Sequence, residues 1–111
     1  MKNKKNGTNL TIAFKALRRK GYFAKQNFLC CQSCGWAEIN ELGYDDKAVF
    51  YHVQDYHDYK DGQDFFLAWR GDGNEIVKTL NKYGVQTLWN GEDNKRIKVL
   101  HKSVKKVSPL L

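Results

Sequence analysis

The sequence predicts a two-layer α+β domain, in which helices cover one face of a mostly antiparallel, four-stranded sheet. Apolar residues follow a helical spacing up to about residue 43, alternate from Ala48, and return to a helical spacing after Asp72. The 111 residues are 41% hydrophobic, which is enough for one packed core. The expected order is helix, helix, strand, strand, helix, strand, strand.

Three helices are expected, near residues 9–20, 33–42 and 74–83. Their apolar stripes are Leu10, Ala13, Phe14 and Leu17; Trp36, Ile39 and Leu42; and Ile76, Val77, Leu80 and Tyr83. Gly21 is a natural terminator for the first helix. Asp72, followed three residues later by Glu75, resembles a capping box at the start of the third.

Four strands are expected, near residues 47–54, 64–70, 85–90 and 95–101. Between the first two, residues 55–62 are predicted to form the loop of a hairpin. Residues 22–29 are predicted to be an aromatic connector or a short extended piece. The whole chain, 1–111, is expected to be one domain, with residues 1–7 and 102–111 as flexible basic tails.

The net charge of +7 is unevenly distributed. Residues 1–25 and 95–111 carry fourteen Lys and Arg and no acid, whereas residues 26–94 carry all twelve acids. The simplest interpretation is that basic ends fold against an acidic middle. The alternative is a nucleic-acid interface, formed if the first helix packs beside the last strand. Its candidate residues are Lys15, Arg18, Arg19, Arg96 and Lys98.

The sequence predicts a cytoplasmic protein with no membrane partner. No apolar run approaches the roughly 18–20 residues that a membrane span needs, and no apolar segment of the signal-peptide kind follows the basic N-terminus. In a reducing compartment the three cysteines are expected to be thiols, and an odd number does not suit a disulfide framework.

All three cysteines lie in one short segment, and they allow three interpretations. In the first, Cys31 and Cys34 form a C-x-x-C that binds zinc together with His52 and His57, although the seventeen intervening residues exceed the usual spacing. No cofactor is the leading expectation, with zinc as the alternative. A purely structural interpretation is that the three cysteines are buried as small core residues.

The second interpretation is a reactive thiol. Its catalytic candidates are Cys31, Cys34, His52 as base and Asp55 as the group that orients the base. A thioredoxin-like arrangement is disfavoured, because the C-x-x-C is not expected to follow the first strand of a βαβ unit. Whichever interpretation holds, Cys31 and Cys34 are expected to converge with His52 in the folded chain.

Three short patterns carry a resemblance to a known family. They are Phe28-x-Cys30-Cys31-x-x-Cys34-Gly35, Phe50-Tyr51-His52-x-Gln54-Asp55, and Trp89-x-Gly91 followed by Arg96-Ile97. Over about residues 20–100 the chain resembles a family of small, uncharacterised bacterial and phage proteins, catalogued as a domain of unknown function. The resemblance implies no activity.

The leading functional prediction is a small intracellular binding or accessory domain that acts mainly through protein contacts, and the question of enzymatic activity stays open, with a non-enzymatic role favoured. Two alternatives remain open. One is a zinc-stabilised nucleic-acid-binding module, and the other is a thiol-dependent enzyme that uses a Cys/His pair.

Overall fold

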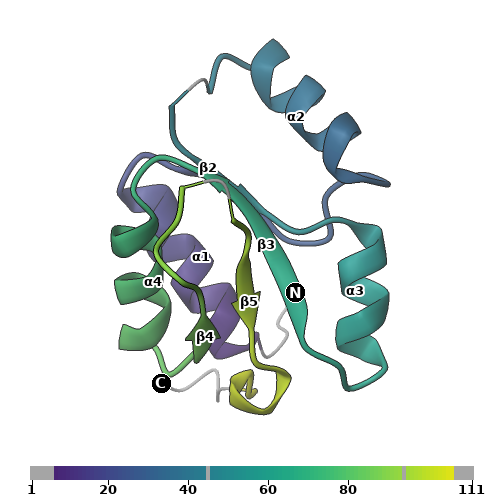
Figure 1. The fold of residues 1–111 in the computed structure, drawn as a ribbon, viewed down its shortest axis with the longest axis vertical. Helices are drawn as coiled ribbons and strands as arrows, with labels where there is room; N and C mark the ends of the chain where they lie inside the picture. The colour runs from purple at the N-terminus through teal and green to yellow at the C-terminus, as the bar shows by residue number, and fades with distance from the viewer. Residues whose placement is uncertain (1–6, 45, 94, 107–111) are drawn as a thin grey trace, which may run out of the picture.

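The computed structural model describes residues 7–44, 46–93 and 95–106, which form an α+β domain. Its elements are α1 (Asn9–Arg19), β1 (Phe23–Lys25), α2 (Gln32–Glu41), β2 (Ala48–Phe50), α3 (Val53–Lys60), β3 (Phe65–Arg70), α4 (Gly73–Lys82), β4 (Thr87–Leu88), β5 (Ile97–Val99) and the 3₁₀ turn η1 (His101–Ser103). Figure 1 shows α1 behind β5, α2 above the sheet and α3 beside β3.

Within the described residues the sheet has five strands in the order β1-β2-β3-β5-β4. β1 pairs with β2 in parallel, and the other neighbours are antiparallel. The prediction of a mostly antiparallel, four-stranded sheet was therefore wrong in strand number, and the additional strand, β1, is the one that pairs in parallel. The extra strand comes from the segment expected to be a connector. It can run parallel to β2 because α2 forms the crossover that a parallel pair requires.

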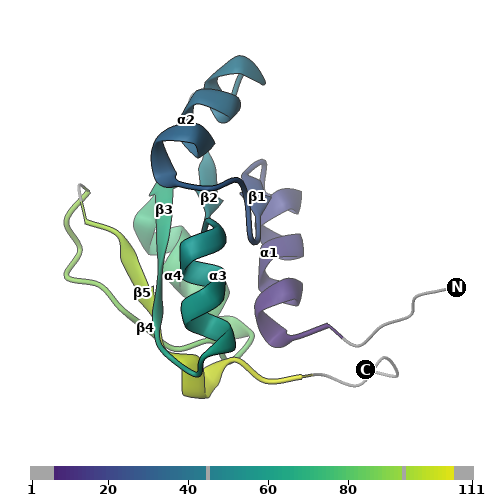
Figure 2. The same ribbon diagram turned by 90° about the vertical axis from the view of Figure 1, so that its right-hand side faces the viewer.

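Helices cover both faces of the sheet, whereas the sequence predicted one. Val49 and Leu67 point into the larger core, which α1 and α4 complete with residues such as Phe14 and Leu80. Ala48, Phe50 and Ala68 alternate with these residues along β2 and β3, point the other way and pack beneath Ile39 of α2. Successive residues of a strand face opposite sides, so one short strand can serve two cores. α1 also contacts β1 and α4, and Figure 2 shows β1 beside α1.

The structure differs most from the prediction at residues 47–62, which were expected to form a strand followed by a loop. β2 ends at Phe50, and α3 occupies residues 53–60. Tyr56 and Tyr59 lie on the side of α3 that packs against the larger core, since residues three apart share a helix face. β2 pairs only with residues 68–70 of β3. α3 packs against β3 where β2 is no longer present.

The three predicted helices are confirmed within one or two residues, and their caps explain their boundaries. The Thr8 hydroxyl accepts a hydrogen bond from the Thr11 N–H, and the Asp72 carboxylate accepts one from the Glu75 N–H at 3.2 Å. Gly21 has φ of +96° directly after α1, a conformation that glycine adopts without steric cost.

The C-terminal segment that the structure describes contacts the start of α1. Asn9 donates its side-chain N–H to the Ser103 carbonyl at 2.8 Å and accepts the Lys105 N–H at 2.9 Å. Residues 102–106, predicted to be part of a basic tail, therefore lie against the domain. Apart from these and Gly7, the two predicted tails fall outside the described residues.

None of the helices in the described ranges has the length and apolar character needed to cross a membrane. The longest of them, α1, has 11 residues.

Candidate metal centre and adjoining groove

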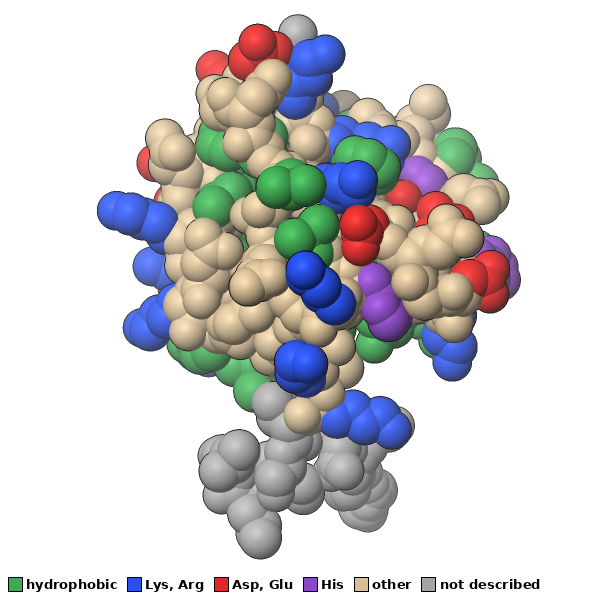
Figure 3. All heavy atoms as spheres, turned by 60° about the horizontal axis from the view of Figure 1, so that its bottom comes forward, with side chains coloured by type: hydrophobic (Ala, Val, Ile, Leu, Met, Phe, Trp, Pro, Cys, Tyr) green, Lys and Arg blue, Asp and Glu red, His purple; other side chains and the backbone are tan. Residues whose placement is uncertain are grey.

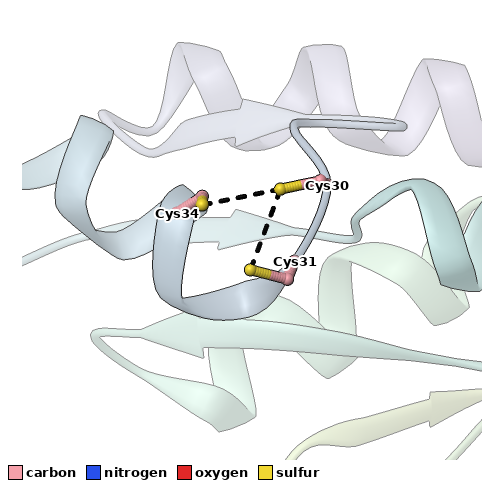
Figure 4. A group of neighbouring side chains, drawn as sticks. All are labelled: Cys30, Cys31 and Cys34. Atoms are coloured by element: carbon pink, nitrogen blue, oxygen red, sulfur yellow. Dashed lines mark hydrogen bonds between the residues drawn. The ribbon is translucent and has the colours of Figure 1, made fainter.

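The three cysteine sulfurs converge at the N-terminal end of α2 (Figure 4). Cys30 lies in the loop before the helix, Cys31 is its N-cap residue, and Cys34 is in its first turn. The Cys30 Sγ lies 3.5 Å from the Cys34 Sγ and 3.9 Å from the Cys31 Sγ, and all three sulfurs lie within 4.8 Å of one another. They are free thiols, and those of Cys30 and Cys34 are exposed. The structural interpretation, in which the three cysteines are buried core residues, is therefore wrong.

The loop before α2 is held by backbone hydrogen bonds to the segment after β2. The Phe28 N–H donates to the Tyr51 carbonyl at 2.8 Å, and the Val53 N–H donates to the Leu29 carbonyl at 3.0 Å. Leu29 has φ of +61°, a left-handed conformation that costs a branched, non-glycine residue about 1–3 kcal/mol. This turn immediately precedes Cys30, so the surrounding fold stabilises a strained conformation that sets the direction of the thiol segment.

α2 lies unusually close to the sheet at Gly35. A Cβ added there would be 2.5 Å from Cε2 and 2.7 Å from Cζ of Phe50. Phe50 is fully buried, and the Trp36 and Phe28 rings pack edge-on against it at 5.0 and 5.6 Å between ring centroids. Gly35 follows Cys34 directly, so this close packing fixes the first turn of α2, and with it the thiols, over the sheet.

Hydrogen bonds within the cluster move the pKa values of Cys31 and Cys34 in opposite directions. The backbone N–H of Cys34 lowers the pKa of the Cys31 thiol, and the side-chain thiols of Cys34 and Cys30 lower it further by donating to the thiolate. The side-chain hydrogen bond of Cys34 with Cys30, followed by the one with Cys31, raises the pKa of Cys34 to about 11. Cys31 is therefore the first of the two to become a thiolate, and Cys34 retains its proton.

The sulfur triangle has dimensions that suit a bound metal ion. Zinc–thiolate bonds of about 2.3 Å at tetrahedral angles place sulfurs about 3.8 Å apart. The Cys30–Cys34 and Cys30–Cys31 sulfur separations, 3.5 and 3.9 Å, lie on either side of this value. Within the described part of the chain no fourth Cys, His, Asp or Glu joins the group. The cluster could thus hold a metal ion through three thiolates, with a coordination position left over.

The structure separates the predicted zinc ligands into two places. Cys31 and Cys34 are in the thiol group, but His52 and His57 are not, and Cys30 is there instead. His52 is the N-cap residue of α3, and its Nε2 lies 3.3 Å from the Asp55 Oδ2. Cys30 was missed as a ligand because the C-x-x-C spacing drew attention to its neighbours. The signal that pointed to it is its direct contiguity with that motif.

The predicted catalytic candidates likewise fall into two groups. His52 and Asp55 would point to opposite faces of a strand, but the start of α3 brings them together at positions i and i+3. Asp55 is only 4% exposed, and the Arg96 Nη1 lies 3.8 Å from its Oδ2. The Nδ1 of His52 is buried and has no hydrogen-bond partner. The His52 imidazole therefore faces a carboxylate and is outside the thiol group.

The cysteine segment lies within a βαβ unit. β1, α2 and the parallel strand β2 form a βαβ unit, and the C-x-x-C lies at the start of its helix. The C-x-x-C therefore follows the first strand of a βαβ unit, contrary to expectation, although residues 26–30 separate it from the end of β1.

A groove of about 260 Å³ lies next to the thiol segment. It is lined by Gln32, Trp36, Ala68, Trp69, Arg70, Asp93, Lys95 and Arg96. Gln32 follows Cys31 in the chain, so the first turn of α2 contributes both to the cysteine cluster and to the groove. The cationic wall of the groove, formed by Arg70, Lys95 and Arg96, was only partly anticipated, through Arg96.

The five residues predicted to bind nucleic acid lie on two sides of the sheet. Lys15, Arg18 and Arg19 are on α1, where the Arg18 guanidinium donates to the Ala24 carbonyl at 2.6 Å. Lys98 points away from α1, because its neighbours Ile97 and Val99 point into the core that α1 completes. Figure 3 shows basic side chains distributed over one face of the molecule, with acidic and histidine side chains among them.

The fold and the site define an α+β domain with a surface cluster of three cysteines. The chain belongs to the family described as a domain of unknown function, DUF6891, whose model matches residues 3–106. No curated protein and no solved structure matches the chain.

Proposed function

We propose that the domain binds a zinc ion through Cys30, Cys31 and Cys34, and that it serves as a metal-binding accessory domain. The observation that carries the proposal is the arrangement of the sulfurs, which lie within 4.8 Å of one another and 3.5 and 3.9 Å apart along two sides. Three convergent soft ligands favour a thiophilic ion, and zinc is the common one with thiolate ligands.

Two further features support this function. The lowered pKa of Cys31 supplies a thiolate for the first metal–sulfur bond, and bound metal then promotes loss of the remaining thiol protons. Exposure of Cys30 and Cys34 leaves the fourth coordination position accessible to water or to a donor from a partner protein. The proposal therefore retains a protein partner, and it assigns the domain to the reducing cytoplasm, where thiols persist.

Titration with Co²⁺ tests the proposal, because cobalt substitutes for zinc and its thiolate bonds absorb in the near ultraviolet. The wild-type chain is expected to bind one equivalent, and Zn²⁺ is expected to displace it. Each single variant, Cys30→Ser, Cys31→Ser and Cys34→Ser, removes one of three ligands and is expected to weaken binding by at least tenfold.

The control variant is Ser33→Ala, which changes an exposed residue between the ligands without removing a sulfur. Its cobalt affinity is expected to equal that of the wild type. Unchanged binding in Cys30→Ser would contradict the three-thiolate site, since only the C-x-x-C pair would then be in use.

A second candidate is thiol redox chemistry, favoured by the Cys30–Cys34 sulfur separation of 3.5 Å and by the placement of the C-x-x-C within a βαβ unit. Cys30 and Cys34 would pass two protons and two electrons to oxidised glutathione, forming one intramolecular disulfide and releasing two molecules of reduced glutathione. Metal-free protein treated with oxidised glutathione and analysed by mass spectrometry tests this. A stable pair of free thiols under these conditions argues against it.

A further inference from the structure

We propose that a pocket between α1 and α3 binds a small aromatic carboxylate. The pocket has a volume of about 370 Å³, within the usual range of roughly 300–1,000 Å³ for small-molecule sites. We call it the tyrosine pocket, because Tyr51, Tyr56 and Tyr59 line it. None of the cysteines lines it, so the proposal does not depend on the metal function proposed above.

The tyrosine pocket lies beyond the carboxyl ends of the two parallel strands. Gln26 directly follows β1 and Tyr51 directly follows β2, and both residues line the pocket. α1 contributes Thr11 and Lys15 to the lining, and α3 contributes two of the tyrosines. In Figure 2 the segment that follows β1 lies between α3 and α1. Open α/β sheets commonly bind ligands in the crevice outside the carboxyl ends of their strands, so this position favours a ligand site.

A chain of hydrogen bonds holds the polar groups of the pocket in place. The Tyr51 hydroxyl donates to the Gln26 Oε1 at 3.2 Å, and the Gln26 Nε2 donates to the Thr11 Oγ1 at 3.0 Å. Tyr51 is only 3% exposed. Its burial, followed by the two other tyrosines and Asp55, raises the pKa of Tyr51, so the hydroxyl retains the proton that it donates. The ends of β1 and β2 are thus tied to α1 before a ligand arrives.

The lining retains hydrogen-bond donors for a ligand. The Gln26 amide keeps one N–H after its bond to Thr11, because an amide nitrogen carries two. Within the described ranges, the hydroxyls of Tyr56 and Tyr59 make no hydrogen bond to protein groups. The Lys15 ammonium adds three donors. Such a lining favours a ligand with several acceptor oxygens.

The charge of the lining favours an anion with a single charge. Of the described residues that line the pocket, only Lys15 is charged. α1 carries no acid, and Lys15 forms no ion pair with any described residue. Asp55 does not line the pocket, and it faces Arg96 and His52. A carboxylate therefore matches the charge of the lining, whereas a phosphate monoester carries nearly one charge more at neutral pH.

The tyrosine rings favour a ligand with a flat, apolar body. Tyr59 packs edge-on against Phe65 with 5.6 Å between ring centroids, and its centroid lies 5.3 Å from that of His101. The Tyr56 ring lies next to it, with 6.4 Å between centroids. The buried Leu10 side chain also lines the pocket. A ring of the ligand can thus pack against rings that are already held, with its carboxylate toward the ammonium group.

Titration of the full, reduced and metal-free chain with benzoate tests the proposal. Binding is followed by the NMR signal of the Gln26 side-chain amide, which lines the pocket. Benzoate is expected to shift this signal saturably at millimolar concentration. Acetate lacks the ring and benzyl alcohol lacks the charge, so each is expected to bind more weakly by about tenfold or more. Acetate affinity equal to that of benzoate would overturn the aromatic part of the assignment, and equal benzyl alcohol affinity would overturn the carboxylate part.

Two variants and one matched control locate the site. Lys15→Gln is expected to weaken benzoate binding by about tenfold or more, as for the loss of a charge-assisted hydrogen bond. Gln26→Glu keeps an acceptor for the Tyr51 hydroxyl but adds a negative charge to the lining, and it is expected to weaken binding at least as much. Arg19→Gln removes a charge from α1 outside the pocket and is expected to bind benzoate as the wild type does.

The outcomes separate this proposal from the metal function. Absence of saturable benzoate binding, unimpaired binding in Gln26→Glu, or equal losses in Lys15→Gln and Arg19→Gln would each overturn the tyrosine pocket as the site. Cys31→Ser is expected to bind benzoate normally, whether or not the wild type binds zinc. A loss of benzoate binding in this variant would place the ligand at the cysteines and contradict the assignment.

Discussion

Gly35→Ala tests how closely α2 packs on the sheet beneath the thiols. A methyl group at this position would be 2.5 Å from the Phe50 ring, about 1 Å short of ordinary van der Waals separation. Phe50 is fully buried and enclosed by neighbouring rings, so it cannot move aside freely. The variant must shift α2 outward or distort the Phe50 side chain.

Two opposing effects set the magnitude. Alanine stabilises a helix interior by about 1 kcal/mol relative to glycine. Overpacking a core costs typically about 1–3 kcal/mol, and this contact is severe. The free energy of unfolding is therefore expected to fall by about 1–2 kcal/mol, measured by urea denaturation with an unchanged dependence on urea concentration. Displacement of the first turn of α2 should also weaken cobalt binding.

Ser33→Ala is the matched control, because it adds a good helix former to the same turn on the exposed side. Its stability is expected to stay within about 0.5 kcal/mol of the wild type. If Gly35→Ala were more stable than the wild type by about 1 kcal/mol, helix propensity alone would operate, and the close approach of α2 to Phe50 would be refuted.

Three further predictions concern ionisation and buried polar groups. At neutral pH, iodoacetamide is expected to alkylate Cys31 faster than Cys34, because the lowered pKa of Cys31 favours its thiolate while the pKa of Cys34 is raised to about 11. Peptide mapping over time measures the two alkylation rates, and equal rates would contradict the prediction. Asp55→Asn removes the buried carboxylate that faces a histidine and an arginine, and it is expected to cost about 1–3 kcal/mol in urea denaturation. Tyr22→Phe leaves the Asp72 N–H without its phenolic acceptor at 3.2 Å, and is expected to cost about 1 kcal/mol; a change below about 0.3 kcal/mol would argue against that hydrogen bond.

Elements with strong local signals could be predicted from the sequence. The apolar stripe from Leu10 to Leu17 has a helical period and is followed by Gly21, and α1 follows it closely. Asp72 was recognised as a cap and does accept the Glu75 N–H. The apolar run that became β3 was also recognised, because its length and composition suit a central strand.

Elements that depend on distant partners could not be predicted. β1 has three residues and becomes a strand only through its pairing with β2, more than twenty residues away. Residues 49–53 alternate as a strand does, but the backbone enters α3 after β2 ends. The aspartates at 55, 58 and 61 recur every third residue, which is close to a helical repeat, and were interpreted as a loop.

The candidate site also combines a feature that was visible in the local sequence with features that depend on distant segments. The sequence singled out the cysteine segment as a candidate site, and the structure brings its three sulfurs together. Whether Cys30 or the histidines join Cys31 and Cys34 depended on side-chain directions that periodicity does not give. The groove could not be predicted, because Trp36, Arg70 and Arg96 come from three separate segments.

X-ray absorption spectroscopy at the zinc edge tests the three-thiolate site most directly. The zinc-loaded chain is expected to show three sulfur neighbours at about 2.3 Å and one lighter neighbour, nitrogen or oxygen, at about 2.0–2.1 Å. Two sulfurs with two nitrogen neighbours would restore His52 and His57 as ligands and contradict the site. Failure of the metal-free, reduced chain to take up zinc at all would contradict the proposed function itself.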